Sequence, residues 1–296
     1  MTPLLWEHDN QDRMKNGMVP IQYLLGFIEE DSPFGDITSD AVIPERNCRA
    51  VIRAEQEGII AGIEEVSALF MHFGVRVEPG KQDGGAVIQH EIVLSLSGNA
   101  RAILLVERTA LNIIGRMSGI ATQTRKLVDR VSSVNSRCRI AATRKTCPGF
   151  RALDKKAVLL GGGDPHRMSL SDGILIKDNH LALVPLTDAI RAAKVVSAYR
   201  NVEVEVETPQ DALTAAKEGA DFILLDNMAP RQVRDTLTGL ERAGLRDHVI
   251  IELSGGIDET MLTEYAALNV DVISMGALTH TVKNFSVTLE ILPGTG

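Results

Sequence analysis

The sequence predicts an α/β protein in which a parallel (β/α) barrel follows a smaller domain of mixed helices and strands. Three observations indicate this fold class. From about residue 139 onward, short β-branched runs alternate with amphipathic stretches. Polar residues follow these runs at nearly regular intervals. Residues 18–100 instead hold short apolar runs separated by turn glycines. A doubly wound open sheet is the alternative for the second half.

The first domain is expected to be an α+β structure. One helix is predicted in EEVSALFMHF, and short antiparallel strands are predicted in CRAVIRAEQEGIIAGI, GVRVEPG and EIVLSLSG. Apolar residues then recur every three or four positions over residues 103–131, which predicts one or two long helices. Whether Gly115 or Gly119 interrupts them is open.

We expect three parts in the chain. Residues 18–115 form the first domain, with residues 280–296 packing on it, and residues 116–279 form the barrel. Residues 1–17 carry mixed charges and are expected to be a disordered leader or a misassigned start.

The second half reads as a βα series whose strands are nearly continuous apolar runs. Such strands are covered on both faces and lie parallel. The predicted strands are RIAAT, ILIK, VEVEVE, FILLD, VIIELSG and DVISMG.

Polar or small residues stand at or near the ends of five of these strands, about 20 to 30 residues apart. They are Lys177, Glu205, Asp226, Ser254 and Gly276. Because active sites of (β/α) barrels are built at the carboxyl ends of the strands, this spacing predicts a ring of ligands around one cavity.

Composition narrows the kind of partner. The chain has 296 residues, 44% of them hydrophobic, and a formal net charge of −8, which disfavours nucleic acid or a membrane surface. Residues 137–167 are locally basic and contain only two acids, Asp154 and Asp164. This stretch predicts a site for an anionic small molecule, although Lys155 and Lys156 fit a solvated helix face equally well.

The three cysteines form no CxxC pair and predict free thiols in a reducing compartment. No run approaches the length of a membrane helix. We therefore expect a cytoplasmic protein.

The alternation in VEVEVE places Glu203, Glu205 and Glu207 on one face of a strand. Three such carboxylates repel one another unless cations lie close, or unless the row faces solvent. Asp226 ends a run too apolar for an edge strand, which favours an inward row. Glu205 and Asp226 are then a candidate Mg²⁺ site with room for phosphate oxygens.

Phosphate binding is predicted after the last two strands. The small residues of SGG (254–256) and MGALT (275–279) allow backbone N–H groups to approach an anion. A simple turn at Gly255 and Gly256 is the alternative interpretation.

Arginine side chains match planar carboxylates. Arg108, Arg144 and Arg167 are candidates, and Lys177 and His166 add charge. A structural role for His166 is as acceptable as a ligand role.

The order of the motifs TRKT, GGG, HR, IKDNH, EVE, LLDN, SGG and GALTH resembles the quinolinate phosphoribosyltransferase family, the carboxylating nicotinate-nucleotide pyrophosphorylases, and most of all their archaeal branch. The resemblance covers nearly the whole chain from FGDITSD onward. It implies an α/β sandwich domain on an incomplete (β/α) barrel, and a homodimer with a shared active site that could assemble further into hexamers.

The resemblance also implies site roles. The catalytic residues would be Lys145, Lys177, Glu205 and Asp226. Quinolinate would be held by Thr143, Arg144, His166, Arg167 and Lys177, with Arg108 reaching in from the neighbouring subunit. Phosphoribosyl pyrophosphate would be held by Lys145, His180, Glu205, Asp226, Ser254, Gly255, Gly256, Gly276 and Ala277. Glu205 and Asp226 would bind Mg²⁺.

Two positions depart from the usual family pattern. Cys147 stands where Thr or Ser is common, and Pro165, which lacks an N–H donor, stands where bacterial members often have Asn. Neither is a charged ligand.

Three alternatives remain at this stage. A relative associated with molybdenum transport would use another acceptor on the same fold. A Schiff-base aldolase would use Lys177 as its nucleophile. A protein that only binds precursors of NAD would not need the metal and pyrophosphate ligands.

Overall fold

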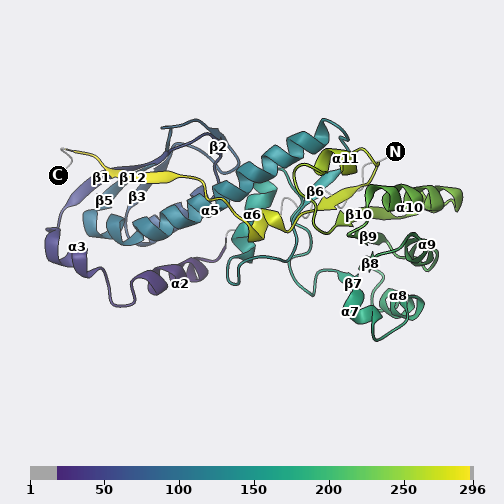
Figure 1. Ribbon diagram of the computed structural model, residues 1–296. Helices are drawn as coiled ribbons and strands as arrows, with labels where there is room; N and C mark the ends of the chain where they lie inside the picture. Colours follow the sequence, from purple (N-terminus) through teal and green to yellow (C-terminus); the bar gives the residue numbers. More distant parts are fainter. Residues whose placement is uncertain (1–18, 294–296) are drawn as a thin grey trace. The chain divides into compact units, whose positions relative to one another are not determined.

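The computed structural model describes residues 19–293, which form two compact units (Figure 1). Among the described residues, unit 1 contains residues 19–125, 147–162 and 281–293. Unit 2 contains residues 126–146 and 163–280. The expected leader, residues 1–17, lies outside the described residues.

Unit 1 is built on a four-stranded antiparallel sheet. Its order is β12 (Val287–Ile291), β1 (Asn47–Ala54), β5 (Ile92–Asn99) and β3 (Arg76–Pro79). A two-stranded ribbon joins β2 (Gly58–Ile59) to β4 (Ala86–Val87). The helix α4 (Ile63–His72) buries Val66, Leu69 and Phe70. The predicted α+β character of this part is confirmed.

Two short helices precede the sheet and were not predicted. They are α2 (Ile21–Asp31) and α3 (Ile37–Val42). Asp36 caps α3, because its carboxylate accepts hydrogen bonds from the backbone N–H groups of Thr38 and Ser39. The FGDITSD motif therefore begins a capped helix.

A single helix of 33 residues, α5 (Ala100–Ser132), follows the sheet, and neither Gly115 nor Gly119 interrupts it. Both glycines instead leave room for residues 283–285, which pack against this helix. The Phe285 N–H donates to the Gly115 carbonyl at 2.8 Å, and a Cβ at Gly119 would lie 2.3 Å from the Lys283 carbonyl oxygen. The boundary expected at residue 115 falls inside this helix, whereas the compact units divide at Arg125.

Unit 2 contains six parallel strands, all at the predicted places. They are β6 (Arg139–Ala141), β7 (Ile174–Ile176), β8 (Val202–Val206), β9 (Phe222–Asp226), β10 (Ile250–Ser254) and β11 (Val272–Ser274). Strands β7 to β11 are neighbours in chain order, and β6 pairs with β11. This is the order of a barrel left open between β6 and β7. The order never reverses as it does in a doubly wound sheet, so that alternative is wrong.

The helices of unit 2 cover the sheet with apolar faces. They are α7 (Asp178–Leu181), α8 (Leu186–Lys194), α9 (Pro209–Lys217), α10 (Pro230–Arg242), the 3₁₀ turn η1 (Arg246–His248), α11 (Leu262–Ala266) and α12 (Ala277–His280). The helices α8, α9 and α10 lie side by side along the strands (Figure 1). Their buried residues, such as Ile190, Ala215 and Leu240, share one core with Val204, Ile223 and other strand residues.

The helix α6 (Arg151–Leu160) belongs to unit 1, although the βα series predicted it as a barrel helix. Its Lys156 lies 2.6 Å from Glu64, 2.7 Å from Glu65 and 3.4 Å from Asp83. Lys155 and Lys156 are both buried. The interpretation as a solvated helix face is therefore wrong, and the Lys156 ammonium serves an internal ionic cluster.

No helix among the described residues is long and apolar enough to cross a membrane.

Candidate active site

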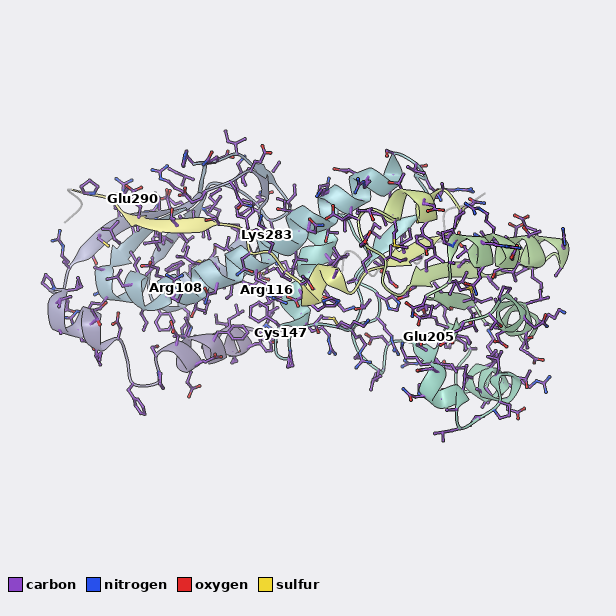
Figure 2. The ribbon with its side chains drawn as sticks, in the orientation of Figure 1. Arg108, Arg116, Cys147, Glu205, Lys283 and Glu290 are labelled. Carbon is purple, nitrogen blue, oxygen red and sulfur yellow. The ribbon has the colours of Figure 1, made fainter. Side chains whose placement is uncertain are left out.

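The predicted ring of strand ends is present in unit 2. Asp226 ends β9 and pairs in register with Ser254, which ends β10. Glu205 lies on the adjacent strand β8 (Figure 2), Lys177 directly follows β7, and Gly276 follows β11. The carboxyl ends of the parallel strands thus bring these five residues to one edge of the sheet, as the spacing predicted.

Lys177 and Glu205 form an ion pair between Nζ and Oε2. The backbone N–H of Lys177 donates to Nδ1 of His180 at 2.9 Å, which fixes the start of α7. A Schiff-base lysine is activated by desolvation or by neighbouring cations, whereas Lys177 contacts a carboxylate and its side chain is partly exposed. The geometry therefore disfavours the Schiff-base interpretation of Lys177.

Glu205 and Asp226 supply oxygen ligands from adjacent strands. Leu224 is opposite Glu205 in the sheet, so Asp226 stands two residues further toward the carboxyl edge. Both side chains are only partly buried, and Asp226 accepts a 2.7 Å hydrogen bond from the Asn227 side chain. The candidate ligands are thus two accessible carboxylates, with no nitrogen or sulfur ligand beside them. Such a pair of oxygen ligands fits Mg²⁺, which retains several waters or phosphate oxygens.

The SGG turn requires its glycines. Gly255 has a φ of +92° and Gly256 a φ of +57°, both in the left-handed region. A Cβ on Gly255 would lie 2.3 Å from Oδ1 of Asn227. The backbone after Ser254 is therefore free of side-chain bulk beside Asp226.

The TRKT segment is tied to α12. The Lys145 N–H donates to Oγ1 of Thr143 at 3.1 Å, and the hydroxyl of Thr279 donates to the Lys145 carbonyl at 2.8 Å. A Cβ on Gly276 would come within 2.9 Å of Lys145 Cδ and 3.0 Å of the His280 ring. The Lys145 side chain thus passes over Gly276. The neighbouring Ala277 begins α12 and is exposed.

Arg144 and Arg167 form a cationic pair. Nε of Arg144 is buried without a hydrogen-bond partner among the residues that the structure describes. Burial lowers the pKa of Arg167 from its usual value, and the charge of Arg144 acts in the same direction, although Glu203 opposes both. Two neighbouring guanidinium groups with an unsatisfied buried N–H favour an anionic ligand.

His166 lies in a cluster with Glu203 and Glu252. Its Nε2 is 3.4 Å from Oε2 of Glu252 and 3.8 Å from Oε2 of Glu203, and its Nδ1 accepts a 2.7 Å hydrogen bond from the Arg167 N–H. Both ring nitrogens therefore face protein groups. The prediction that His166 holds a substrate carboxylate stays a prediction, but this ring orientation does not support it.

This cluster retains protons strongly. Burial opposes a charged imidazole, but the hydrogen bonds that the ring donates to Glu203 and Glu252 outweigh it and raise the pKa of His166 to about 10. Burial also raises the pKa of Glu203. Since the Arg167 N–H donates to Nδ1, the ring hydrogen on Nε2 faces the two carboxylates.

Comparison with known proteins agrees with this arrangement. The family model of the N-terminal domain of quinolinate phosphoribosyl transferase matches residues 36–118, and that of its C-terminal domain matches residues 120–290. The chain belongs to the quinolinate phosphoribosyl transferase family. Together the two models cover most of the chain, including every predicted site residue.

Curated relatives of the family are named nicotinate-nucleotide pyrophosphorylase [carboxylating]. The protein from Methanothermobacter thermautotrophicus carries that name as probable, and it is 48% identical over 268 residues, which cover 89% of this chain and 96% of the relative. The Homo sapiens protein is 35% identical over 245 residues, which cover 82% of each chain. A crystal structure of the Ehrlichia chaffeensis nicotinate-nucleotide pyrophosphorylase has a TM-score of 0.87 at 30% identity and covers 93% of this chain and 99% of its own.

The family's implied ligands are divided between the two units. Arg108 is an exposed side chain of α5 in unit 1 (Figure 2), whereas the other implied ligands belong to unit 2. Cys147 is an exposed free thiol. Pro165 lies between Asp164, whose carboxylate accepts the His166 N–H, and the His166 cluster.

Three further residues at this edge were not predicted as site residues. Glu252 is an acid within the apolar strand IIELS, Glu203 belongs to the VEVEVE row, and His280 ends the GALTH motif. The sequence signal for Glu252 was a single carboxylate in an otherwise buried strand, which requires a partner. The groups that meet the VEVEVE row are the His166 ring at Glu203 and the Lys177 ammonium at Glu205.

Proposed function

We propose that this protein transfers the phosphoribosyl group of phosphoribosyl pyrophosphate to quinolinate and releases pyrophosphate and CO₂. The product is nicotinate mononucleotide, a precursor of NAD. The enzyme is a pentosyltransferase, a carboxylating nicotinate-nucleotide pyrophosphorylase like its curated relatives.

The observation that carries this proposal is the Arg144–Arg167 pair. Its unsatisfied buried N–H and its mutual repulsion favour a ligand with two carboxylates in a plane. Quinolinate is such a dianion. Thr143 and Lys177 complete the acceptor site, and a monocarboxylate such as nicotinate would leave one guanidinium uncompensated.

The donor is bound by residues that follow several strands of unit 2. Lys145 and His180 meet the pyrophosphate, and the backbone of Ser254, Gly255 and Gly256 and of Gly276 and Ala277 approaches the phosphates. Glu205 and Asp226 would hold Mg²⁺ with the pyrophosphate oxygens. Bound there, the metal would offset the negative charge that builds on the leaving pyrophosphate.

The chain positions the reacting atoms and stabilises charge. The guanidinium pair orients the pyridine so that its nitrogen attacks C1 of the ribose as the C1–O bond breaks. Positive charge grows on the sugar, near the carboxylates of Glu205 and Asp226, while Lys145 stabilises the departing oxygens. No covalent bond to the protein is required.

Decarboxylation follows from the same step. Once the ring nitrogen is alkylated, it is cationic and stabilises the electron pair left on the adjacent carbon when its carboxylate departs as CO₂. A proton then takes that place on the ring.

The proposed active site is shared by two subunits, with Arg108 contributed by the partner. The exposure of the Arg108 side chain on α5 supports this part. Mixing inactive Arg108→Ala with inactive Lys145→Ala subunits should restore activity, because one of the two hybrid sites is intact. Heterodimers without recovered activity would contradict a shared site.

We also propose a cytoplasmic location. The three cysteines, Cys48, Cys138 and Cys147, are free thiols, which supports a reducing compartment.

The direct test is incubation of the purified protein with quinolinate, phosphoribosyl pyrophosphate and Mg²⁺. Nicotinate mononucleotide and CO₂ are measured together, and nicotinate serves as the control acceptor. We expect equal amounts of both products from quinolinate and none from nicotinate. Binding of phosphoribosyl pyrophosphate without product from quinolinate would contradict the proposal and indicate another acceptor.

A further inference from the structure

The unusual feature of His166 is that its ring bridges a backbone amide and two buried acids. Nδ1 accepts the N–H of Arg167 at 2.7 Å, and Nε2 faces Glu252 at 3.4 Å and Glu203 at 3.8 Å. The side chains of Glu252 and Glu203 are 3% and 10% exposed. A side chain with both nitrogens so placed holds other groups in position.

The backbone at this point is strained. His166 has a φ of +54°, a left-handed conformation that is unfavourable for a non-glycine residue. Two contacts stabilise it. The His166 N–H donates to Oδ1 of Asp164 at 2.8 Å, and the His166 ring accepts the next N–H along the chain. The turn that aims Arg167 therefore depends on the orientation of the imidazole.

The segment before this turn is anchored to the open edge of the barrel. Asp164 bridges to Ala141 of β6 in parallel, with its N–H donating to the Ile140 carbonyl at 2.7 Å and its carbonyl accepting from Ala142 at 2.8 Å. Asp164 is thus fixed by β6, while Glu203 and Glu252 are fixed by β8 and β10. The His166 ring is the piece that links these fixed points to Arg167.

A metal site is the obvious alternative for this cluster, because one ligand atom from each of His166, Glu203 and Glu252 lies within 4.8 Å of the others. A metal would need the lone pair of Nε2. The Arg167 N–H takes the lone pair of Nδ1, so the ring hydrogen is on Nε2. The geometry is therefore that of a hydrogen-bond donor facing carboxylates.

The buried carboxylates of Glu203 and Glu252 lower the stability of the fold. Oε1 of Glu203 and Oε1 of Glu252 are buried without a hydrogen-bond partner among residues 19–293. Buried acceptors without a partner destabilise a fold, so the presence of glutamates at these two positions indicates a role other than stability.

We propose that Glu252 is a positioning residue that acts through His166 on Arg167. Its carboxylate fixes the imidazole, the imidazole fixes the Arg167 amide, and the guanidinium of Arg167 is thereby set for the acceptor carboxylate. Glu203 shares this role. The role of Arg167 as an acceptor ligand rests on the proposed function, whereas the link from Glu252 to the Arg167 amide does not.

Glu252 is the better residue to change. Glu203 is two residues from Glu205, whereas the sheet partners of Glu252 are the apolar Leu224 and Val272. The variant Glu252→Gln keeps the shape and removes the charge. Glu241→Gln, an exposed change on α10, is the matched control.

The first measurement is hydrogen exchange at the Arg167 amide by NMR, which needs no substrate. We expect its protection to fall at least tenfold in Glu252→Gln, with unchanged protection in the β9 core and in Glu241→Gln. Unchanged protection at Arg167 would overturn the proposal. Loss of protection throughout unit 2 would also overturn it, because Glu252 would then act on the fold as a whole.

The second measurement is kinetic. Glu252→Gln should raise KM for quinolinate about tenfold, with KM for phosphoribosyl pyrophosphate within twofold of the parent enzyme. In an Arg167→Met background, Glu252→Gln should have no further effect on KM for quinolinate, because the guanidinium through which Glu252 acts is absent. Equal changes in the KM values for quinolinate and phosphoribosyl pyrophosphate would overturn the proposal. Effects of Glu252→Gln and Arg167→Met on KM for quinolinate that simply add would also overturn it. A parent enzyme that forms no nicotinate mononucleotide, together with a loosened Arg167 amide, would instead place the failure in the proposed function.

Discussion

Gly276 and Lys145 lie so close together that one methyl group would force them apart. A Cβ at position 276 would be 2.9 Å from Cδ of Lys145 and 3.0 Å from the His280 ring. Contacts under 3.0 Å require one partner to move. Since Lys145 is the proposed pyrophosphate ligand, glycine at 276 is a condition for its orientation.

We therefore expect Gly276→Ala to raise KM for phosphoribosyl pyrophosphate at least tenfold, about 1.4 kcal/mol, without unfolding the protein. Gly276 is outside the left-handed region, so alanine adds bulk but no backbone strain. Steady-state kinetics and thermal unfolding measure the two effects. Gly239→Ala, which meets nothing within 4 Å on α10, is the control. An unchanged KM in Gly276→Ala would contradict the packing of Lys145 over this position.

The two glycines of the SGG turn should differ in their tolerance. Both are left-handed, so alanine at Gly256 should cost about 1 to 2 kcal/mol from strain alone. Alanine at Gly255 should cost more, because its Cβ would also clash with Asn227. Urea unfolding of Gly255→Ala and Gly256→Ala compares the two. Equal losses would show that Asn227 moves aside freely.

Arg116, labelled in Figure 2, forms a partly buried ion pair with Asp154 in unit 1, with Nε 2.7 Å from Oδ1 and Nη2 2.9 Å from Oδ2. Asp154 is fully buried. Arg116→Met should cost about 3 to 5 kcal/mol of stability, because it leaves the carboxylate uncompensated. The double variant Arg116→Met with Asp154→Leu should recover much of this loss in urea unfolding. Additive losses would contradict a mutual pairing.

Stability should fall in alkaline solution through Cys138. Burial, with a smaller effect of Asp271, raises the pKa of this thiol from 9.0 to about 12. Below pH 9 the thiol is protonated in both states, so its contribution is fully present. Between pH 9 and 12 only the unfolded chain ionises, and stability is lost at about 1.4 kcal/mol per pH unit.

The Cys138→Ala variant isolates this effect, since the other titrating groups are common to both proteins. Urea unfolding at several pH values from 8 to 10.5 should show a steeper decline for the parent protein. Parallel curves would mean that Cys138 ionises equally in the folded and unfolded states.

The sequence predicted the strands of unit 2 well because a parallel strand buried on both faces is an unmistakable apolar run. It predicted the strand-end residues Asp226 and Ser254 for the same reason, since they interrupt such runs at their ends, whereas Glu205 was placed by its spacing from Asp226. The helices α2 and α3 were missed. They are short, and the boundary of α3 depends on the Asp36 cap rather than on periodicity.

The internal ionic clusters could not be predicted. Lys156 meets Glu64, Glu65 and Asp83, residues 73 to 92 positions earlier in the chain, and no local pattern links them. The partnership of His166 with Glu252 likewise joins two distant segments. A charged residue in an apolar run signals that a partner exists, but the fold alone identifies it.

The segment 147–162, which contains α6 and belongs to unit 1, prevents a division of this protein by a single cut in the chain. Unit 2 is discontinuous in the chain, because residues 126–146 and 163–280 are separated by a piece that packs elsewhere. A single cut between the two matched domains, near residue 119, would leave α6 on the fragment that does not contain its packing partners. Neither half is therefore an independently transferable module, and recombination that exchanges one half between relatives must also replace α6 with a helix that fits its new partners.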